Sequence, residues 1–146
     1  MFRGNAPAHI DDKGRLKVPN GFRVLLETKY GRELFVTSLN GDFVRLYPMP
    51  VWIEIEERLS AMPSTHPARV RFLDRANYFG QQVELDAQGR VVIPSRLRES
   101  ALMTGEVDVL GNIDHLGVWN HERFLLKLDR EPFTDEDSRA LAEFKI

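Results

Sequence analysis

Two ten-residue stretches of this chain share one arrangement of an aspartate, a glycine and an arginine. Residues 10–19 read IDDKGRLKVP and residues 85–94 read LDAQGRVVIP. The residues that recur, 75 positions apart, are Asp11 with Arg15 and Asp86 with Arg90. An aspartate can accept a proton in catalysis or accept backbone N–H bonds in a turn. An arginine can bind carboxylates, phosphates or base edges through its rigid fork of donors.

Catalysis is the first chemistry to test against these residues. His9, Asp11 and Asp12 could form an acid–base cluster in the first stretch. In the second stretch, glutamate and alanine replace the histidine and the second aspartate, so the cluster is not repeated. The chain has no cysteine, no glycine-rich phosphate loop and no nucleophile elbow, and its four histidines lack the spacing of a metal site. We therefore expect no enzyme, no metal, no cofactor and no small-molecule substrate.

The aspartates and glycines are explained most simply as parts of a hairpin turn. In a three-residue hairpin loop the glycine takes the left-handed position, and the aspartate side chain accepts backbone N–H groups. That geometry makes the aspartate and the arginine of each motif neighbours across the hairpin neck. The residues expected to structure the turns are Asp11, Gly14, Asp86 and Gly89.

Turn geometry explains the arginines less well, because further cations surround both motifs. Residues 1–32 carry a net charge of +4, although the whole chain has a formal net charge of −2. Acidic residues concentrate elsewhere, in EIEE at 54–57 and DEDS at 135–138. A phosphate-binding surface needs such a local basic face, since binding follows the local field and not the total charge. A solvated charged face without a ligand is the alternative.

The elements that must position these residues also occur twice. Each repeat reads as two short strands around the turn, a helix, two further strands and an amphipathic helix. Pro19 and Pro94 suit the first turn of a helix, and Gly31 and Gly105 suit helix C-caps. The further strands are expected at 34–38, 43–47, 107–111 and 116–119, and the amphipathic helices at about 50–61 and 120–130. A short basic-faced helix up to about Asn77 and a last helix opened by Thr134 or Asp135 complete the prediction.

The repeats divide the chain into modules. We expect a first module at 1–62, a linker with a short helix at 63–76, a second module at 77–131 and a C-terminal helix at 132–146. A single module would have a thin core, because units of that size are marginally stable. The two modules should therefore cover each other about a pseudo-two-fold axis. A hydrophobic content of 42% without a signal-peptide or membrane-spanning segment predicts a soluble protein, and the lack of cysteine favours a cytoplasmic location.

The N-terminal MFRG, the two hairpin motifs and the segment LYPMPVW…EERL together resemble the MraZ family over essentially the whole chain. The resemblance implies an α+β, mainly β fold of two tandem AbrB/SpoVT-type modules. Swapped hairpins of the two modules would interlock into one small barrel with flanking helices. The resemblance also implies a transcriptional regulator of the bacterial division and cell-wall gene cluster, in the cytoplasm and associated with the nucleoid.

What the resemblance implies for the site is DNA binding. The arginine of each motif corresponds to a residue on the DNA-facing surface of related proteins, and the arginine after each helix-opening proline lies nearby. The full set expected to contact DNA is Arg3, Lys13, Arg15, Lys17, Arg23, Gln88, Arg90, Arg96 and Arg98. In the second repeat, Gln88 and Val92 stand where the first has lysines, so the two repeats need not contribute equally. Arg96 could compensate for the missing lysines.

Members of this family assemble into closed rings and bind short direct repeats upstream of their own operon. The resemblance therefore implies a homo-oligomeric ring that acts as a repressor on double-stranded DNA. The helices at 50–61 and 120–130 and the C-terminal helix are candidates for subunit contacts, with Trp52, Phe124 and Phe144 as core or interface residues. Two alternatives remain open: an AbrB-fold antitoxin-type module that binds DNA and a protein, and an oligomeric scaffold without a DNA role.

Overall fold

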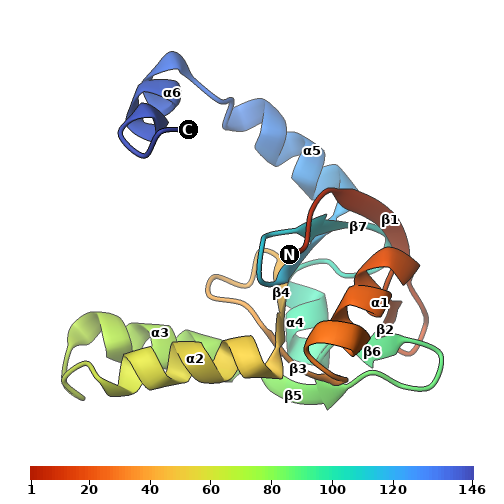
Figure 1. The fold of residues 1–146 in the computed structure, drawn as a ribbon. Helices are drawn as coiled ribbons and strands as arrows, with labels where there is room; N and C mark the ends of the chain where they lie inside the picture. Colours follow the sequence, from red (N-terminus) through yellow and green to blue (C-terminus); the bar gives the residue numbers. More distant parts are fainter.

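The computed structural model describes residues 1–146 and shows one eight-stranded antiparallel sheet, rolled into a nearly closed barrel with helices around it (Figure 1). The order of strands is β5-β3-β4-β8-β7-β1-β2-β6, and β5 also touches β6. The strands are β1 (Asn5–Ile10), β2 (Arg15–Lys17), β3 (Glu33–Thr37), β4 (Val44–Pro48), β5 (Gln81–Glu84), β6 (Arg90–Val92), β7 (Gly105–Gly111) and β8 (Leu116–Asn120). The mainly β class predicted from the sequence is confirmed.

The strands of the two halves of the chain interleave around the barrel. β1 pairs with β7 and β3 pairs with β5, so that each half adds a strand to the sheet of the other. β2 pairs with β6, and β4 pairs with β8. In the β2–β6 ladder Leu16 lies opposite Val91, its own counterpart in the repeat. This exchange is consistent with two tandem AbrB-like modules related by a pseudo-two-fold axis.

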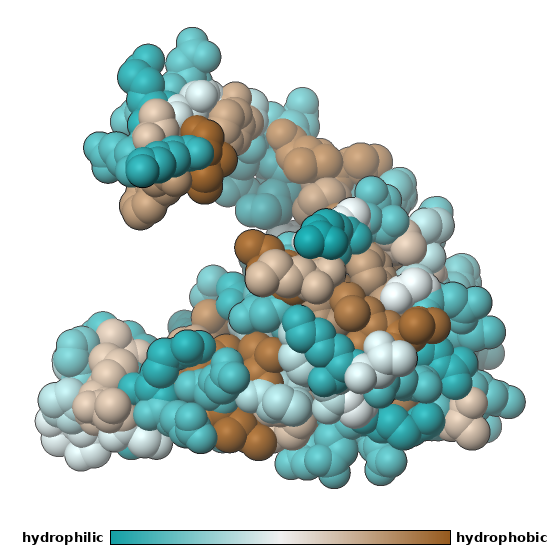
Figure 2. Space-filling view, in the orientation of Figure 1, coloured by the Kyte–Doolittle hydropathy of each residue, from teal (hydrophilic) through white to brown (hydrophobic).

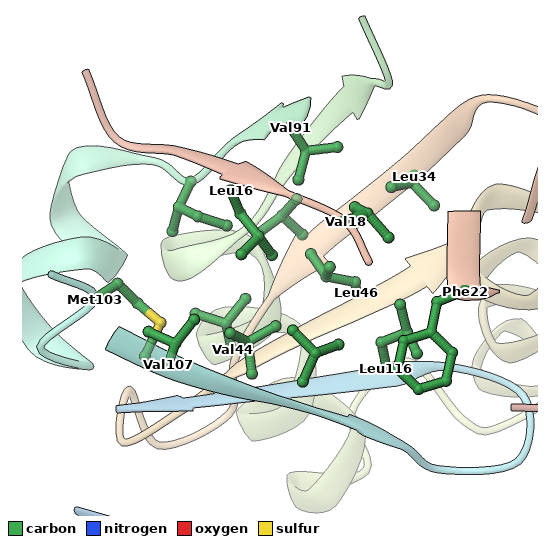
Figure 3. Close-up of a cluster of buried hydrophobic side chains, with 14 of the residues drawn as sticks. Leu16, Val18, Phe22, Leu34, Val44, Leu46, Val91, Met103, Val107 and Leu116 are labelled. Carbon is green, nitrogen blue, oxygen red and sulfur yellow. The ribbon is translucent and has the colours of Figure 1, made fainter. Parts of the chain in front are cut away.

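The core fills the inside of the barrel and draws on both halves (Figure 3). Alternate residues of each strand point inward, as the pleat requires. Leu16, Leu46, Val91 and Leu116 are all at most 1% exposed and pack within one hydrophobic cluster. Because this cluster includes residues of both repeats, neither half has a complete core of its own.

Helix α1 (Asn20–Lys29) begins and ends close to where its sequence predicts. Pro19 occupies the N-cap, immediately before the first helical residue and not within the first turn. Gly31 has a φ of +102° and its N–H donates to the Leu26 carbonyl at 2.9 Å. This is the expected left-handed glycine at a helix C-terminus.

Helix α4 (Ser95–Ser100) is shorter than its counterpart α1, and the C-cap predicted at Gly105 is wrong. The helix ends after Ser100, and Leu102 takes a left-handed φ of 53°. Gly105, with φ +65°, opens strand β7 instead. The early end lets Met103 turn into the core, where it is fully buried. Burial of this side chain therefore overrides the helical spacing of the sequence.

Helices α2 (Met49–Ser60) and α3 (Pro67–Phe79) form a hairpin that packs on strand β3 (Figure 1). The ring of Trp52 stacks on Phe35 at 4.5 Å and on Phe72 at 6.1 Å between centroids. The buried Thr37 hydroxyl donates to the Ala76 carbonyl at 2.7 Å. Trp52 is thus a core residue of this hairpin, and the short helix expected near Asn77 is a full helix of thirteen residues.

Helices α5 (His121–Arg130) and α6 (Asp135–Ala142) leave the barrel as an arm, residues 121–146 (Figure 1). Phe124 packs beside Trp119 at 5.6 Å, but no residue of either helix is buried. Figure 2 shows hydrophobic surface on this arm and open space between α6 and the α2–α3 hairpin. The apolar residues of the arm that are more than half exposed are Leu125, Leu126, Leu128, Phe133, Phe144 and Ile146.

Helix α6 begins with a capping box. The Thr134 hydroxyl accepts the Asp137 N–H at 3.1 Å, and the Asp137 carboxylate accepts the Thr134 N–H at 3.0 Å. Thr134 is therefore the N-cap, one of the two residues expected for it. None of the helices combines the length and the apolar character that crossing a bilayer requires.

Candidate nucleic-acid interface

The first motif folds into a tight hairpin turn between β1 and β2. The Asp11 N–H donates to the Arg15 carbonyl at 3.0 Å, and the Gly14 N–H donates to the Asp11 carbonyl at 2.9 Å. Gly14 has a φ of +76°, which a residue with a side chain rarely adopts. The Asp11 carboxylate accepts the N–H groups of Lys13 at 3.0 Å and Arg15 at 2.9 Å. The carboxylate therefore stabilises the turn by accepting two of its backbone N–H groups.

The second motif repeats these contacts between β5 and β6. The Asp86 carboxylate accepts the N–H groups of Gln88 and Arg90, both at 2.9 Å, and Gly89 has a φ of +77°. In both hairpins the arginine Nε then reaches the second carboxylate oxygen, at 2.7 Å for Arg15 and 2.8 Å for Arg90. Each motif arginine is thus oriented by its own aspartate.

These contacts keep both carboxyl groups ionised. The backbone N–H of Arg15 is the largest cause that lowers the pKa of Asp11, helped by the Arg15 side chain and the Lys13 N–H and opposed by desolvation. The equivalent groups of Arg90 and Gln88 lower the pKa of Asp86 to about 2. A carboxylate with so low a pKa is a poor proton acceptor near neutral pH. The aspartates of the motif therefore act as structural acceptors.

The two hairpins are joined to each other through the β2–β6 ladder. The Val18 N–H donates to the Gly89 carbonyl at 3.0 Å, and the Ile93 N–H donates to the Gly14 carbonyl at 2.9 Å. Each turn is thus hydrogen-bonded to the strand that follows the other turn. The doubled motif forms one continuous surface, and Figure 1 shows β2 and β6 on the opposite side of the barrel from α3 and α6.

The outer side of this ladder is basic. Leu16 and Val91 face the core, so their neighbours in the two strands face outward. Lys17 lies directly opposite Arg90, and Arg15 lies directly opposite Val92. Directly opposed side chains lie about 5 Å apart at Cβ, close enough to act on one ligand. We call this surface the basic ladder face; its residues are Arg15, Lys17, Arg90 and Val92.

Two further predicted arginines lie over the turns, each over the turn of the other repeat. The guanidinium of Arg98, on α4, lies against Gly14, where a Cβ atom would collide with it. Arg23, on α1, lies against Gly89, where a Cβ would come within 2.6 Å of Cδ. The Arg23 guanidinium also donates to the Ala87 carbonyl at 3.1 Å. The helix of one module is therefore fixed to the hairpin of the other.

Not every residue expected to contact DNA lies on this surface. Lys13 and Gln88 are exposed at the turn tips, beside the basic ladder face. Arg96 is instead held against α3, with its guanidinium 4.2 Å from the Tyr78 ring and a bond to the Tyr78 carbonyl at 3.3 Å. Arg3 precedes β1 at the end away from the turn, separated from it by about 20 Å of strand. The structure does not bring Arg3 together with the hairpins.

Sequence reasoning missed two residues that support the second hairpin. Arg32 donates through Nη2 to the carbonyls of Leu85 and Asp86. Glu27 binds Arg23 Nε at 2.7 Å and lies 3.8 Å from Arg32 Nη1. The i, i+4 spacing of Arg23 and Glu27 on a helix could have revealed their pair. The Arg32 contact, which spans 53 residues of sequence, left no such signal.

The basic ladder face suits acceptors that are anionic or that present two acceptor atoms side by side. Arginine side chains bind phosphate oxygens or guanine O6 and N7 in bidentate fashion, and lysines bind phosphates as point charges. No group of three or more histidine, aspartate or glutamate side chains is placed to hold a metal ion. The chemistry of the face is therefore that of arginine and lysine donors on a rigid sheet.

Comparison with known proteins identifies the family of the chain. A family model described as "MraZ protein, putative antitoxin-like" matches residues 1–75 and 80–144. The chain belongs to the MraZ family. The two matched segments contain the two hairpins, so the MraZ match covers both copies of the motif and not one alone.

Curated MraZ relatives span the whole chain. A protein of Acidobacterium capsulatum is 49% identical over 146 residues, and one of Koribacter versatilis is 49% identical over 147 residues, each covering 100% of both chains. A protein of Herpetosiphon aurantiacus is 39% identical over 144 residues, or 98% of this chain and 95% of its own. All three are named transcriptional regulator MraZ. Membership thus assigns the chain to a family of transcriptional regulators.

Proposed function

We propose that this transcriptional regulator is a repressor that binds short direct repeats of double-stranded DNA upstream of its own operon, in a division and cell-wall gene cluster. The observation that carries the proposal is the basic ladder face, where two hairpins present Arg15, Lys17 and Arg90 on one rigid surface. The family membership of the chain supports the regulatory role. Binding at the promoter would exclude the transcription machinery from the same DNA.

Binding combines a general and a specific component. Lysines and arginines that neutralise phosphates release counterions, so affinity falls as salt rises and depends little on sequence. Arginines that reach base edges in the major groove supply specificity, with guanine O6 and N7 as their preferred acceptors. Arg15 and Arg90 are suited to base edges because their own aspartates fix the orientation of each guanidinium. Lys13, Lys17 and Gln88 surround them and suit the phosphate backbone.

Recognition of repeats needs more than one copy of the chain. A single face with a few phosphate contacts binds weakly, whereas several faces on one ring raise the effective concentration at neighbouring repeats. We propose that copies associate as a closed ring on the nucleoid. The arm supports this proposal, because its exposed leucines and phenylalanines are apolar surface without a partner in the single chain. Large exposed apolar patches on a soluble protein often mark sites of protein–protein contact.

Fluorescence anisotropy tests the proposal. The protein is titrated against the DNA upstream of its own gene and against a shuffled control, over a series of salt concentrations. We expect preference for the native segment, and loss of that preference in the Arg15→Ala/Arg90→Ala double variant at unchanged oligomer size. Weak binding that is equal for both DNAs and indifferent to these arginines would reject the regulator and leave the scaffold.

An antitoxin-type module is the second candidate function. The family description includes the words antitoxin-like, and the apolar arm could hold a protein partner as well as a second copy. The two candidates differ in what the arm binds. If the purified chain alone forms a ring of uniform size, its arms are occupied by other copies, and no separate protein partner is required for assembly.

A further inference from the structure

The two ends of the β2–β6 ladder differ in the state of their helix-borne arginine. We call the end with the Asp11–Arg15 turn the first end and the end with the Asp86–Arg90 turn the second end. At the second end Arg23 is held by two partners: its Nε binds Glu27 at 2.7 Å and its Nη2 donates to the Ala87 carbonyl at 3.1 Å. The hydrogen bond from Arg23 is also the main cause that lowers the pKa of Glu27, which keeps the pair ionised.

At the first end Arg98 has no such partner. Its guanidinium lies on Gly14, but the side chain makes no ion pair and no hydrogen bond, and its Nε is a buried donor left unsatisfied. A buried donor without an acceptor costs free energy, whereas an acceptor from outside would satisfy it. Asp12 and Glu99 line the same pocket, yet neither carboxylate comes within ion-pairing distance of Arg98.

The difference follows from the residue four positions after each arginine and from the lengths of the two helices. Helix α1 continues to Lys29, so the residue four positions after Arg23 is Glu27, on the same helix face. Helix α4 ends after Ser100, so the residue four positions after Arg98 is Leu102, in the left-handed turn beyond the helix. The partner that neutralises Arg23 therefore has no counterpart for Arg98.

Arg98 also has more open space around it than Arg23 has. At the second end Arg32 fills the space beside the turn and donates to the carbonyls of Leu85 and Asp86. The counterparts of those two residues are Ile10 and Asp11, and at the first end they line an open pocket of about 370 Å³ together with Arg98. The pocket gives the Arg98 guanidinium room to leave Gly14 and meet a ligand.

We propose that Arg98, and not its counterpart Arg23, supplies the helix-borne contact to a DNA phosphate, and that Glu27 withholds Arg23 from this contact. The inference rests on the proposed function and deepens it. Two phosphate oxygens would satisfy the free guanidinium of Arg98 in bidentate fashion. Arg23 would first have to give up a carboxylate and a carbonyl.

Unequal ends give the face a direction on DNA. A surface with true two-fold symmetry reads a palindromic site, because operator symmetry mirrors protein symmetry. Here the first end offers Lys13 and the free Arg98, while the second end offers Gln88 and a neutralised Arg23. One face should therefore bind one repeat in a single orientation, which suits direct repeats.

Binding to a duplex that carries one repeat, measured by anisotropy over a salt series, tests the role of Arg98. We expect Arg98→Ala to weaken binding about tenfold and to reduce the slope of log K against log salt by about 1, as loss of one phosphate contact does. The matched Arg23→Ala should leave the salt slope unchanged, because Arg23 makes no phosphate contact, and Glu27→Gln should tighten binding because it frees Arg23. Equal reductions of the salt slope in the two alanine variants would overturn the proposal.

Controls separate this proposal from the function on which it rests. If Arg15→Ala/Arg90→Ala leaves binding intact, the regulator itself is rejected; if that variant fails to bind while Arg23→Ala and Arg98→Ala reduce the salt slope equally, only the asymmetry is rejected. Arg98→Lys guards against misfolding, since it keeps the charge. It should retain the salt slope of the unaltered protein, and a slope like that of Arg98→Ala would contradict a phosphate contact.

Orientation can be tested independently, because the chain contains no cysteine and a single introduced one is unique. Asp12→Cys and Ala87→Cys, at exposed counterpart positions outside the set expected to contact DNA, place a DNA-cleaving label at the tip of the first or the second turn. On a single repeat we expect the two labels to cut opposite flanks, one flank each. Cutting of both flanks by each label would show that the face binds in both directions and would overturn the proposal.

Discussion

At the scale of single residues, the two motif glycines meet two demands at once. Gly14 and Gly89 take φ values of +76° and +77°, which suit glycine on conformational grounds alone. Each glycine also lies directly beneath an arginine of the other repeat, so a Cβ atom would collide with that side chain. The spacing of aspartate, glycine and arginine in the motif therefore serves the docking of the helix arginine as well as the turn.

A substitution pair separates these two demands. We expect Gly89→Ala to destabilise the fold by about 1–3 kcal/mol, measured by urea unfolding. It adds to an unfavourable φ a clash with Arg23, which Glu27 and the Ala87 carbonyl hold in place. Gly31→Ala is the control: its φ is +102°, but nothing lies within 4 Å of an added Cβ, so it reports the conformational cost alone. In an Arg23→Ala background the cost of Gly89→Ala should fall toward that of Gly31→Ala. An unchanged cost would mean that the Arg23 side chain moves aside without loss of stability.

The carboxylate of Asp86 makes stability depend on acid pH. Its pKa is lowered from 3.8 to about 2 in the folded chain, so the folded state favours the charged form. The stabilisation is fully present above the unfolded pKa of 3.8 and is lost as pH falls through about 2. The difference in unfolding free energy between the unaltered protein and Asp86→Asn should therefore shrink between pH 5 and pH 2.

At the scale of elements, local signals predict local structure well. The two turns, their flanking strands and the cap at Thr134 follow from residues within a few positions of one another. Predictions fail where a contact with a residue distant in the sequence determines the local structure. The end of α4 depends on burial of Met103, and the support of the second turn depends on Arg32, 53 residues away from Leu85. The separation of Arg3 from the first turn follows instead from the length of β1, which has six residues.

Burial of the strands distinguishes the core from the arm. We expect Leu46→Ala to cost about 2–5 kcal/mol in thermal or urea unfolding, because the side chain is 1% exposed within the barrel and its removal leaves a cavity. The matched change Leu128→Ala, in a side chain 55% exposed on α5, should stay within about 0.5 kcal/mol for the single chain. Similar costs for both would mean that Leu128 is buried, either against the barrel or against another copy of the chain.

At the scale of the whole molecule, the two surfaces that need partners point away from each other. The basic ladder face lies on one side of the barrel, and the α2–α3 hairpin and the arm extend on the other (Figure 1). A copy bound to DNA through its hairpins can thus keep its arm available for a neighbour. If arms join copies, DNA binding and self-association use separate residues and can be altered one at a time.

The double variant Leu125→Glu/Leu128→Glu tests this separation. Charges on the apolar side of α5 should oppose association, so light scattering after gel filtration should show a shift from ring to smaller species. Affinity for DNA with several repeats should fall about 100-fold or more, because avidity is lost, while affinity for a single repeat stays unchanged. Arg15→Ala/Arg90→Ala is the mirror control, with binding lost at constant size. If the arm variant weakens single-repeat binding as much as array binding, the two surfaces are not independent, and the arm contributes to the DNA interface itself.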